Sequence, residues 1–131
     1  MPNIDPALLE ALIQVESSGN PNAFNKGSGA RGLTQITPIA WKDLVARHPQ
    51  VYGKLKYERD VFKPEIARQA GLDYLNIIQG YLKHYKMPMT TENLLGSYNW
   101  GVGNVRDSGL GKAPKETRDY IKKINAILGS K

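Results

Sequence analysis

The sequence predicts a mainly α-helical fold with a glycine-rich loop or small strand region after the first helix. Apolar residues recur at helical spacing in several segments, whereas strands have little support. Four prolines stand just inside the expected start of a helix, where a missing N–H costs nothing: Pro6, Pro38, Pro64 and Pro114. With 131 residues, we expect a single domain over residues 1–131.

The composition is that of a globular, basic chain. Hydrophobic residues make up 40% and charged residues 23%, and the formal charge is +6. Such a charge favours approach to polyanions, whether nucleic acid, anionic lipid or an acidic wall polymer. The absence of cysteine excludes disulfides and thiolate sites. No apolar run is long enough for a membrane helix, and the sequence given has no ordinary secretory leader.

The first helix is predicted to begin with Asp5 as N-cap and Pro6 at the first helical position. The run Ser17, Ser18, Gly19, Asn20 and Pro21 then stops it. Glu16 continues its apolar face into the last turn, where an acidic side chain is out of place for packing alone. The face itself consists of Leu8, Leu9, Leu12 and Ile13.

Residues 20–36 are expected to form a glycine-rich loop, with short strand pairing as an option. Thr37 resembles an N-cap, so a second helix is predicted over 37–46. Residues 48–62 give no clear assignment. The acidic residues Asp60 and Asp73 fit solvated faces or helix starts.

The longest helix is predicted from Pro64 to just before Pro88, which ends the pattern. A short helix is expected over 91–99, a glycine-rich loop over 101–111 and a last helix from Pro114. The expected apolar face of the longest helix is Ile66, Ala70, Tyr74, Ile77, Ile78, Tyr81 and Tyr85. That of the last helix is Tyr120, Ile121, Ile124, Ile127 and Leu128.

Glu16 is the first candidate for chemistry. A carboxyl group on an apolar face loses hydration, which disfavours its charged form. Such a glutamic acid can stay protonated near neutral pH and act as a general acid. The competing interpretation, which periodicity alone favours, is that Glu16 turns out to water at the helix end.

Three further segments suit carbohydrate recognition. Gln35, in the run GARGLTQITP, offers both a donor and an acceptor. Tyr98 and Asn99, in SYNWGVG, combine an aromatic face with an amide, and Tyr120 ends the segment ETRDY. Taken singly, these segments also fit a glycine-rich connection, a helix cap and a core tyrosine.

The order and spacing of these motifs closely resemble the lytic transglycosylase domain of the soluble type, a lysozyme-like family that cleaves peptidoglycan. The similarity runs over roughly residues 5–125 and includes PEIARQAGLDYL, which resembles the family's central helix. It implies a lysozyme-like or goose-type-lysozyme-like fold and one catalytic domain.

The resemblance also assigns roles. Glu16 matches the family's sole catalytic acid and base. The positions that match substrate-binding or supporting residues are Ser17, Gln35, Tyr98, Asn99 and Tyr120. Thr34 stands where methionine is usual and Trp100 where alanine is usual, so the shape of the sugar subsites is open.

The implied substrate is the β-1,4 bond between N-acetylmuramic acid and N-acetylglucosamine in peptidoglycan strands, with a 1,6-anhydromuramyl product favoured over hydrolysis by a muramidase. No cofactor or metal is expected, since His48 and His84 lack ligand spacing. We expect a monomer that acts on the cell wall, in the periplasm or outside, without membrane insertion. It could be phage-encoded, carried by a virion, or a trimmed domain of an exported protein.

Two other classes remain. A nucleic-acid-binding helical domain would need clustered basic residues, but here Lys122 and Lys123 are the only adjacent pair. A non-catalytic wall-binding module on the same fold would not need Glu16.

Overall fold

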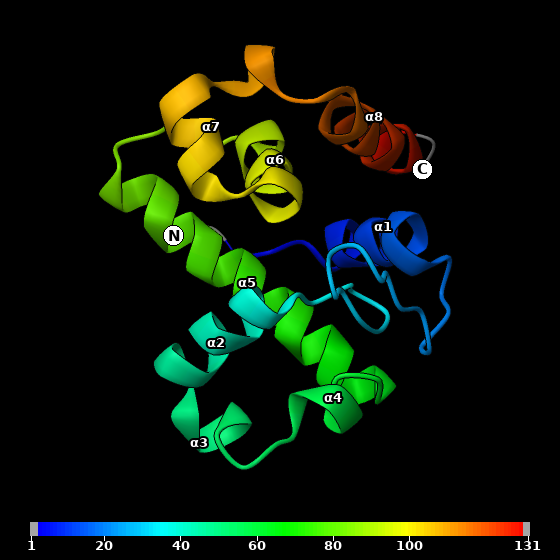
Figure 1. Ribbon diagram of the computed structural model, residues 1–131. Coiled ribbons are helices and arrows are strands. Elements are labelled where there is room, and N and C mark those ends of the chain that lie inside the picture. Colours follow the sequence, from blue (N-terminus) through cyan, green and yellow to red (C-terminus); the bar gives the residue numbers. More distant parts are fainter. Residues whose placement is uncertain (1–2, 130–131) are drawn as a thin grey trace. The chain divides into compact units, whose positions relative to one another are not determined.

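The structure is a computed structural model that describes residues 3–129, and it is mainly α-helical, as predicted (Figure 1). Within these residues there is no β-sheet, only the isolated bridges Phe24↔Arg31 and Arg31↔Ile36 in the loop after the first helix. The helices are α1 (Pro6–Ser17), α2 (Pro38–Arg47), α3 (Pro49–Tyr52), α4 (Tyr57–Asp60), α5 (Pro64–His84), α6 (Thr91–Trp100), α7 (Val102–Ser108) and α8 (Lys115–Gly129), with a 3-10 turn η1 (Leu110–Lys112).

The chain divides into two compact units. The loop unit comprises residues 9–74 and holds most of α1, the glycine-rich loop, α2 to α4 and the first half of α5. The bundle unit comprises residues 75–129 together with residues 3–8. None of the helices in the described part of the chain is long and apolar enough to cross a membrane.

The core of the loop unit joins α1, the loop and α5. Leu9, Ile13, Leu33 and Ala67 form one buried cluster, against which Leu72 packs. Trp41 of α2 packs against the ring of Tyr52 with centroids 5.3 Å apart. Thr37 caps α2 as predicted, because its hydroxyl accepts from the Ala40 N–H at 3.2 Å.

At two positions in the loop unit the backbone lies so close to neighbouring atoms that only glycine fits. Gly32 has φ +81°, and a Cβ there would lie 2.5 Å from the Val61 carbonyl oxygen. At Gly71 a Cβ would lie 2.6 Å from Thr34 Cγ2. Side chains at these positions would push the loop away from α5 and from the segment after α4.

Residues 48–62, which had no clear assignment, form the short helices α3 and α4. The expectation that Asp60 lies on a solvated face is wrong, because the residue is only 1% exposed. Its carboxylate accepts the Lys56 N–H at 2.7 Å and pairs with Arg59 and Lys63, each at 3.1 Å. The pKa of Asp60 lies well below its usual range because the Arg59 guanidinium, the Lys56 N–H and Lys63 stabilise the carboxylate, although burial has the opposite effect.

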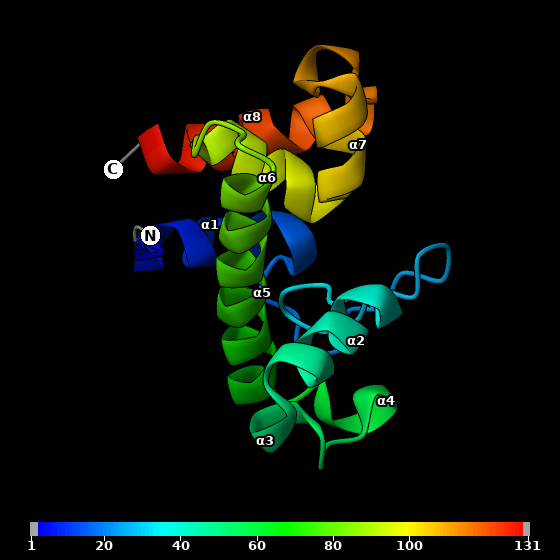
Figure 2. The same ribbon diagram turned by 90° about the vertical axis from the view of Figure 1, so that its left-hand side faces the viewer.

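In the bundle unit α6 packs closely against its neighbours, and Figure 1 and Figure 2 both show it beside α7 and α8. Gly96 permits this approach, since a Cβ there would lie 2.5 Å from Leu110 Cδ2. Leu95 and Ile124 are fully buried. Thr90 caps α6 by accepting the Asn93 N–H at 3.0 Å.

The prediction of a loop over residues 101–111 is wrong, since most of this segment forms α7 and η1. Two of the four glycines that suggested a loop stand at the ends of α7, whereas Gly103 lies within α7 and Gly111 within η1. Gly101 (φ +100°) precedes α7 and Gly109 (φ +80°) follows it. Val105 supplies the buried side chain that holds the short helix in place.

The predicted apolar face of α5 is only partly right. Ala70, Ile77 and Ile78 are buried, but Ile66 and the three tyrosines of that face are half-buried. The side chains with no exposure on this helix include Ala67, Leu75 and Leu82. Tyrosine at helical spacing is therefore a poorer marker of the core here than the small and branched residues between.

Candidate functional site

The last turn of α1 carries Glu16, which is half-buried. Ser17, the next residue, links this turn to the glycine-rich loop, because its hydroxyl lies 2.8 Å from the Leu33 carbonyl oxygen. The same hydroxyl lies 3.1 Å from the Ile13 carbonyl oxygen within the helix. The helix then ends because Ser18 and Gly19 take left-handed backbone angles, with φ +55° and +78°. The position of the glutamate is thus set by the helix and by its attachment to the loop.

Gln35 occupies a tight turn within the loop unit. Its backbone has φ +52°, and the main chains of Arg31 and Ile36 pair on either side of it, with N···O distances of 3.1 and 3.0 Å. The side-chain Nε2 donates to the carbonyls of Gly32 at 3.0 Å and Ala23 at 3.2 Å. Two carbonyls on one side of the amide orient it, so that the Oε1 atom faces the other way.

The bundle unit carries the remaining predicted site residues. Tyr98 and Asn99 are half-buried near the end of α6, and Tyr120 on α8 is 6% exposed. Asn99 Oδ1 accepts a 2.8 Å hydrogen bond from Thr117 Oγ1. Sequence reasoning did not single out Thr117, although it stands in the segment ETRDY three residues before Tyr120.

The two departures from the family pattern fall in different surroundings. Thr34 has no exposure, and its hydroxyl donates to the Ala67 carbonyl oxygen at 2.7 Å. This residue therefore changes the packing of the loop on α5. Trp100 is half-buried at the end of α6, and its carbonyl accepts from Asn104 Nδ2 at 2.6 Å.

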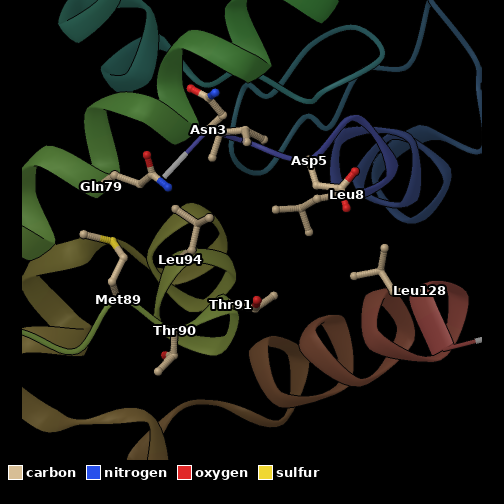
Figure 3. A pocket seen from close by; sticks show the side chains of 10 residues that line it. Asn3, Asp5, Leu8, Gln79, Met89, Thr90, Thr91, Leu94 and Leu128 are labelled. Carbon is tan, nitrogen blue, oxygen red and sulfur yellow. The ribbon is translucent and has the colours of Figure 1, made fainter. Parts of the chain in front are cut away.

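Two pockets lie away from the predicted site residues. One of about 220 Å³ opens in the bundle unit between Leu8 of α1, Gln79 of α5, Leu94 of α6 and Leu128 of α8 (Figure 3). It adjoins the start of α6, whereas Asn99 lies near the end of that helix. A shallower one in the loop unit lies between Leu9, Leu72 and the polar side of α5. Neither pocket includes a predicted site residue.

The described part of the chain places no group of three or more histidine, aspartate or glutamate side chains where they could hold a metal ion.

The fold is that of a lytic transglycosylase domain. It superposes on the 70 kDa soluble lytic transglycosylase of Escherichia coli with a TM-score of 0.76 and 24% identity, over 95% of this chain and 21% of that one. It also superposes on an inactive mutant of lytic transglycosylase Slt from Pseudomonas aeruginosa with a TM-score of 0.75 and 19% identity, over 95% and 21% of the two chains.

The sequence comparisons agree with the fold. The chain is 32% identical over 126 residues to endo-type membrane-bound lytic murein transglycosylase A of Salmonella paratyphi B. The match takes in 95% of this chain but only 59% of that protein. Residues 1–121 match the Transglycosylase SLT domain. The chain belongs to the transglycosylase SLT domain family.

Proposed function

We propose that this chain is a peptidoglycan lytic transglycosylase that uses Glu16 as its single catalytic acid and base. The observation that carries the proposal is that a hydrogen bond links the last turn of α1 to the glycine-rich loop. There a half-buried glutamate is followed by a serine whose hydroxyl reaches the Leu33 carbonyl oxygen at 2.8 Å. Membership of the SLT family, which spans residues 1–121, supports the reaction class and a single catalytic domain.

The first step is protonation. The Glu16 carboxylic acid gives its proton to the glycosidic oxygen between N-acetylmuramic acid and N-acetylglucosamine as the C1–O bond breaks. Because only one carboxyl group is assigned, the muramyl 2-acetamido group stabilises the developing positive charge at C1, as in substrate-assisted glycosidases. The proposal gains support from the Pseudomonas protein, whose inactive mutant carries glutamine in place of a glutamate.

The second step closes the anhydro ring. The Glu16 carboxylate takes the proton from the muramyl 6-hydroxyl, whose oxygen attacks C1 and forms the new C–O bond. The carboxylic acid is restored, and no water is consumed.

The other proposed site residues bind or position the substrate. Gln35 accepts from a sugar hydroxyl or amide through Oε1, since its Nε2 is already bonded to two loop carbonyls. Ser17 holds the catalytic turn in place. Tyr98 and Asn99 bind the sugar, and Tyr120 orients the acid.

The substrate also defines the setting. We propose that the chain works as a monomer on glycan strands of the cell wall, in the periplasm or outside the cell. Its formal charge of +6 speeds approach to an anionic wall polymer.

Mass spectrometry of the products of purified peptidoglycan, before and after borohydride reduction, tests the proposal. Anhydro ends resist reduction and are one water lighter than hydrolysed ends, and we expect them to predominate. Reducible muramic ends would instead establish a muramidase. The absence of any product would favour a non-catalytic wall-binding module.

A further inference from the structure

The side chain of Arg31 lies over two aromatic rings of the loop unit. The central carbon of its guanidinium is 5.1 Å from the centre of the Phe24 ring and 4.9 Å from that of Tyr57. Such cation–π contacts hold the planar group in place without using its hydrogen-bond donors. Its main chain pairs with Ile36 across the turn that carries Gln35.

The Tyr57 ring is itself fixed. Its hydroxyl lies 2.6 Å from the Ile36 carbonyl oxygen and 2.8 Å from that of Gly29. The ring packs against Trp41 with centroids 5.4 Å apart. Burial raises the pKa of Tyr57 to about 12, although the nearby positive charge of Arg31 works against this rise. Of the two rings that form the platform under Arg31, that of Tyr57 is therefore held in place, while the Phe24 side chain is 49% exposed.

The hydrogen-bond donors of the guanidinium are not satisfied by the fold. Within residues 3–129 it forms no hydrogen bond or ion pair, and its Nε is buried without a partner. A buried donor left unsatisfied is unfavourable, because the hydrogen bonds that it made to water are not replaced. The residue as a whole is half-buried and Nε is its one fully enclosed nitrogen, so the Nη edge meets solvent. The fold maintains an oriented positive charge that its own side chains do not neutralise.

We propose that Arg31 binds a carboxylate of the peptidoglycan substrate through its Nη edge. The planar fork of a guanidinium matches the two oxygens of a carboxylate, and the resulting hydrogen bonds are charge-assisted. Peptidoglycan offers carboxylates on its peptide substituents and, where a peptide is missing, on the muramyl lactyl group. This inference rests on the proposed function and names a substrate feature recognised in addition to the sugar.

The test uses intact peptidoglycan and the same material with its carboxylates converted to neutral amides. Arg31→Met removes the charge but keeps an apolar stem over the rings. We expect this variant to raise KM on intact strands about tenfold or more, with kcat unchanged. On amidated strands it should match the wild type. Arg31→Lys, which keeps the charge but loses the fork, should fall between the two.

Arg68→Met is the matched control, since it removes the same charge from an arginine of the loop unit that pairs with Glu10. A KM effect of Arg31→Met that is equal on both substrates, or that Arg68→Met reproduces, would overturn the inference. Strands stripped of peptide reveal the source of the carboxylate. A lasting effect there identifies the lactyl group, and its loss identifies the peptide.

A binding measurement separates this inference from the proposed function. Co-sedimentation of Glu16→Gln protein with intact and amidated peptidoglycan requires no turnover. We expect the Glu16→Gln protein to bind the amidated material more weakly than the intact material. The double variant Glu16→Gln/Arg31→Met should bind the two materials equally. Chemical unfolding should show Arg31→Met to be folded. If the wild type cleaves nothing, the proposed function fails, whereas the sedimentation difference still decides the role of Arg31.

Discussion

The hydroxyl of Thr117, in the first turn of α8, donates a 2.8 Å hydrogen bond to the side-chain oxygen of Asn99, near the end of α6. Thr117 is 1% exposed, so water does not replace this bond. The bond links the two helices and fixes the Asn99 amide with its nitrogen directed away from Thr117.

Thr117→Val should therefore weaken the bundle unit without changing its shape. The substitution leaves Asn99 Oδ1 without its donor, which we expect to lower the free energy of unfolding by about 1–2 kcal/mol. Urea titration followed by circular dichroism measures this change. The exposed Thr91 at the start of α6 provides a control as Thr91→Val. Equal stability of the two variants would contradict the prediction.

Glu16→Gln should abolish wall cleavage while leaving the helical circular dichroism spectrum unchanged. Loss of a general acid costs about a hundredfold in rate or more, which turbidity assays on cell walls detect. Glu10→Gln is a fair control because Glu10 is exposed on the same helix. A Glu16→Gln protein that still clears walls would remove the catalytic assignment.

Tyr120→Phe should lower turnover more than it lowers binding. The proposed role of the hydroxyl is to orient the acid, and a hydrogen bond to a charged or ionising group is worth about 1.5–3 kcal/mol. We expect kcat to fall about tenfold or more with little change in KM. An unchanged rate would return Tyr120, which is 6% exposed, to a packing role.

Asp60 should make the loop unit sensitive to acid. Its pKa in the folded protein lies below that of the unfolded chain because Arg59, Lys63 and the Lys56 N–H favour the carboxylate. The resulting stability is present above the unfolded pKa of about 4 and is lost as the pH falls through the folded value.

Thermal unfolding between pH 7 and pH 2 measures this effect. Asp60→Asn should lower the melting temperature at pH 7 and flatten its fall toward pH 2. The neighbouring exposed Glu58 serves as the control in Glu58→Gln, which should keep the wild-type slope. An unchanged slope in Asp60→Asn would show that other carboxylates set the acid limit.

Gln79→Met should stabilise the protein. Gln79 is 4% exposed, and its Oε1 is buried without a hydrogen-bond partner beside the pocket shown in Figure 3. Replacing this amide with an apolar side chain of similar volume should raise the free energy of unfolding by about 1 kcal/mol. Gln69→Met, at an exposed position of α5, should not. A loss of stability in Gln79→Met would show that the amide is needed in the pocket.

Much of the fold could be predicted from local signals. The N-caps Asp5 and Thr37 marked the starts of α1 and α2, and Pro64 marked the start of α5. Such signals can be recognised because capping depends on a few neighbouring residues. The run from Ser17 to Pro21 was predicted to stop the first helix, and α1 ends at Ser17, the first residue of that run. These elements required no knowledge of tertiary packing.

The errors arose where packing over a distance decides the structure. Glycines at 101 and 109 serve as helix boundaries, but in sequence they look the same as loop glycines. The neighbours Arg59, Lys63 and the Lys56 N–H satisfy the Asp60 carboxylate, but the burial of this residue depends on how its segment packs, which the local sequence does not show. The platform under Arg31 joins residues 24, 31 and 57, which no short motif connects.

The two hydrogen bonds of Gln35 Nε2 to loop carbonyls give its amide a fixed polarity. Of the two kinds of group that an amide offers, the loop consumes the donors and presents the acceptor. Any ligand that meets this side chain must therefore bring a proton of its own, in a hydroxyl or an N–H. If Gln35 binds a sugar hydroxyl as proposed, esterification of that hydroxyl would place an oxygen against an oxygen, and strands modified in this way should bind more weakly.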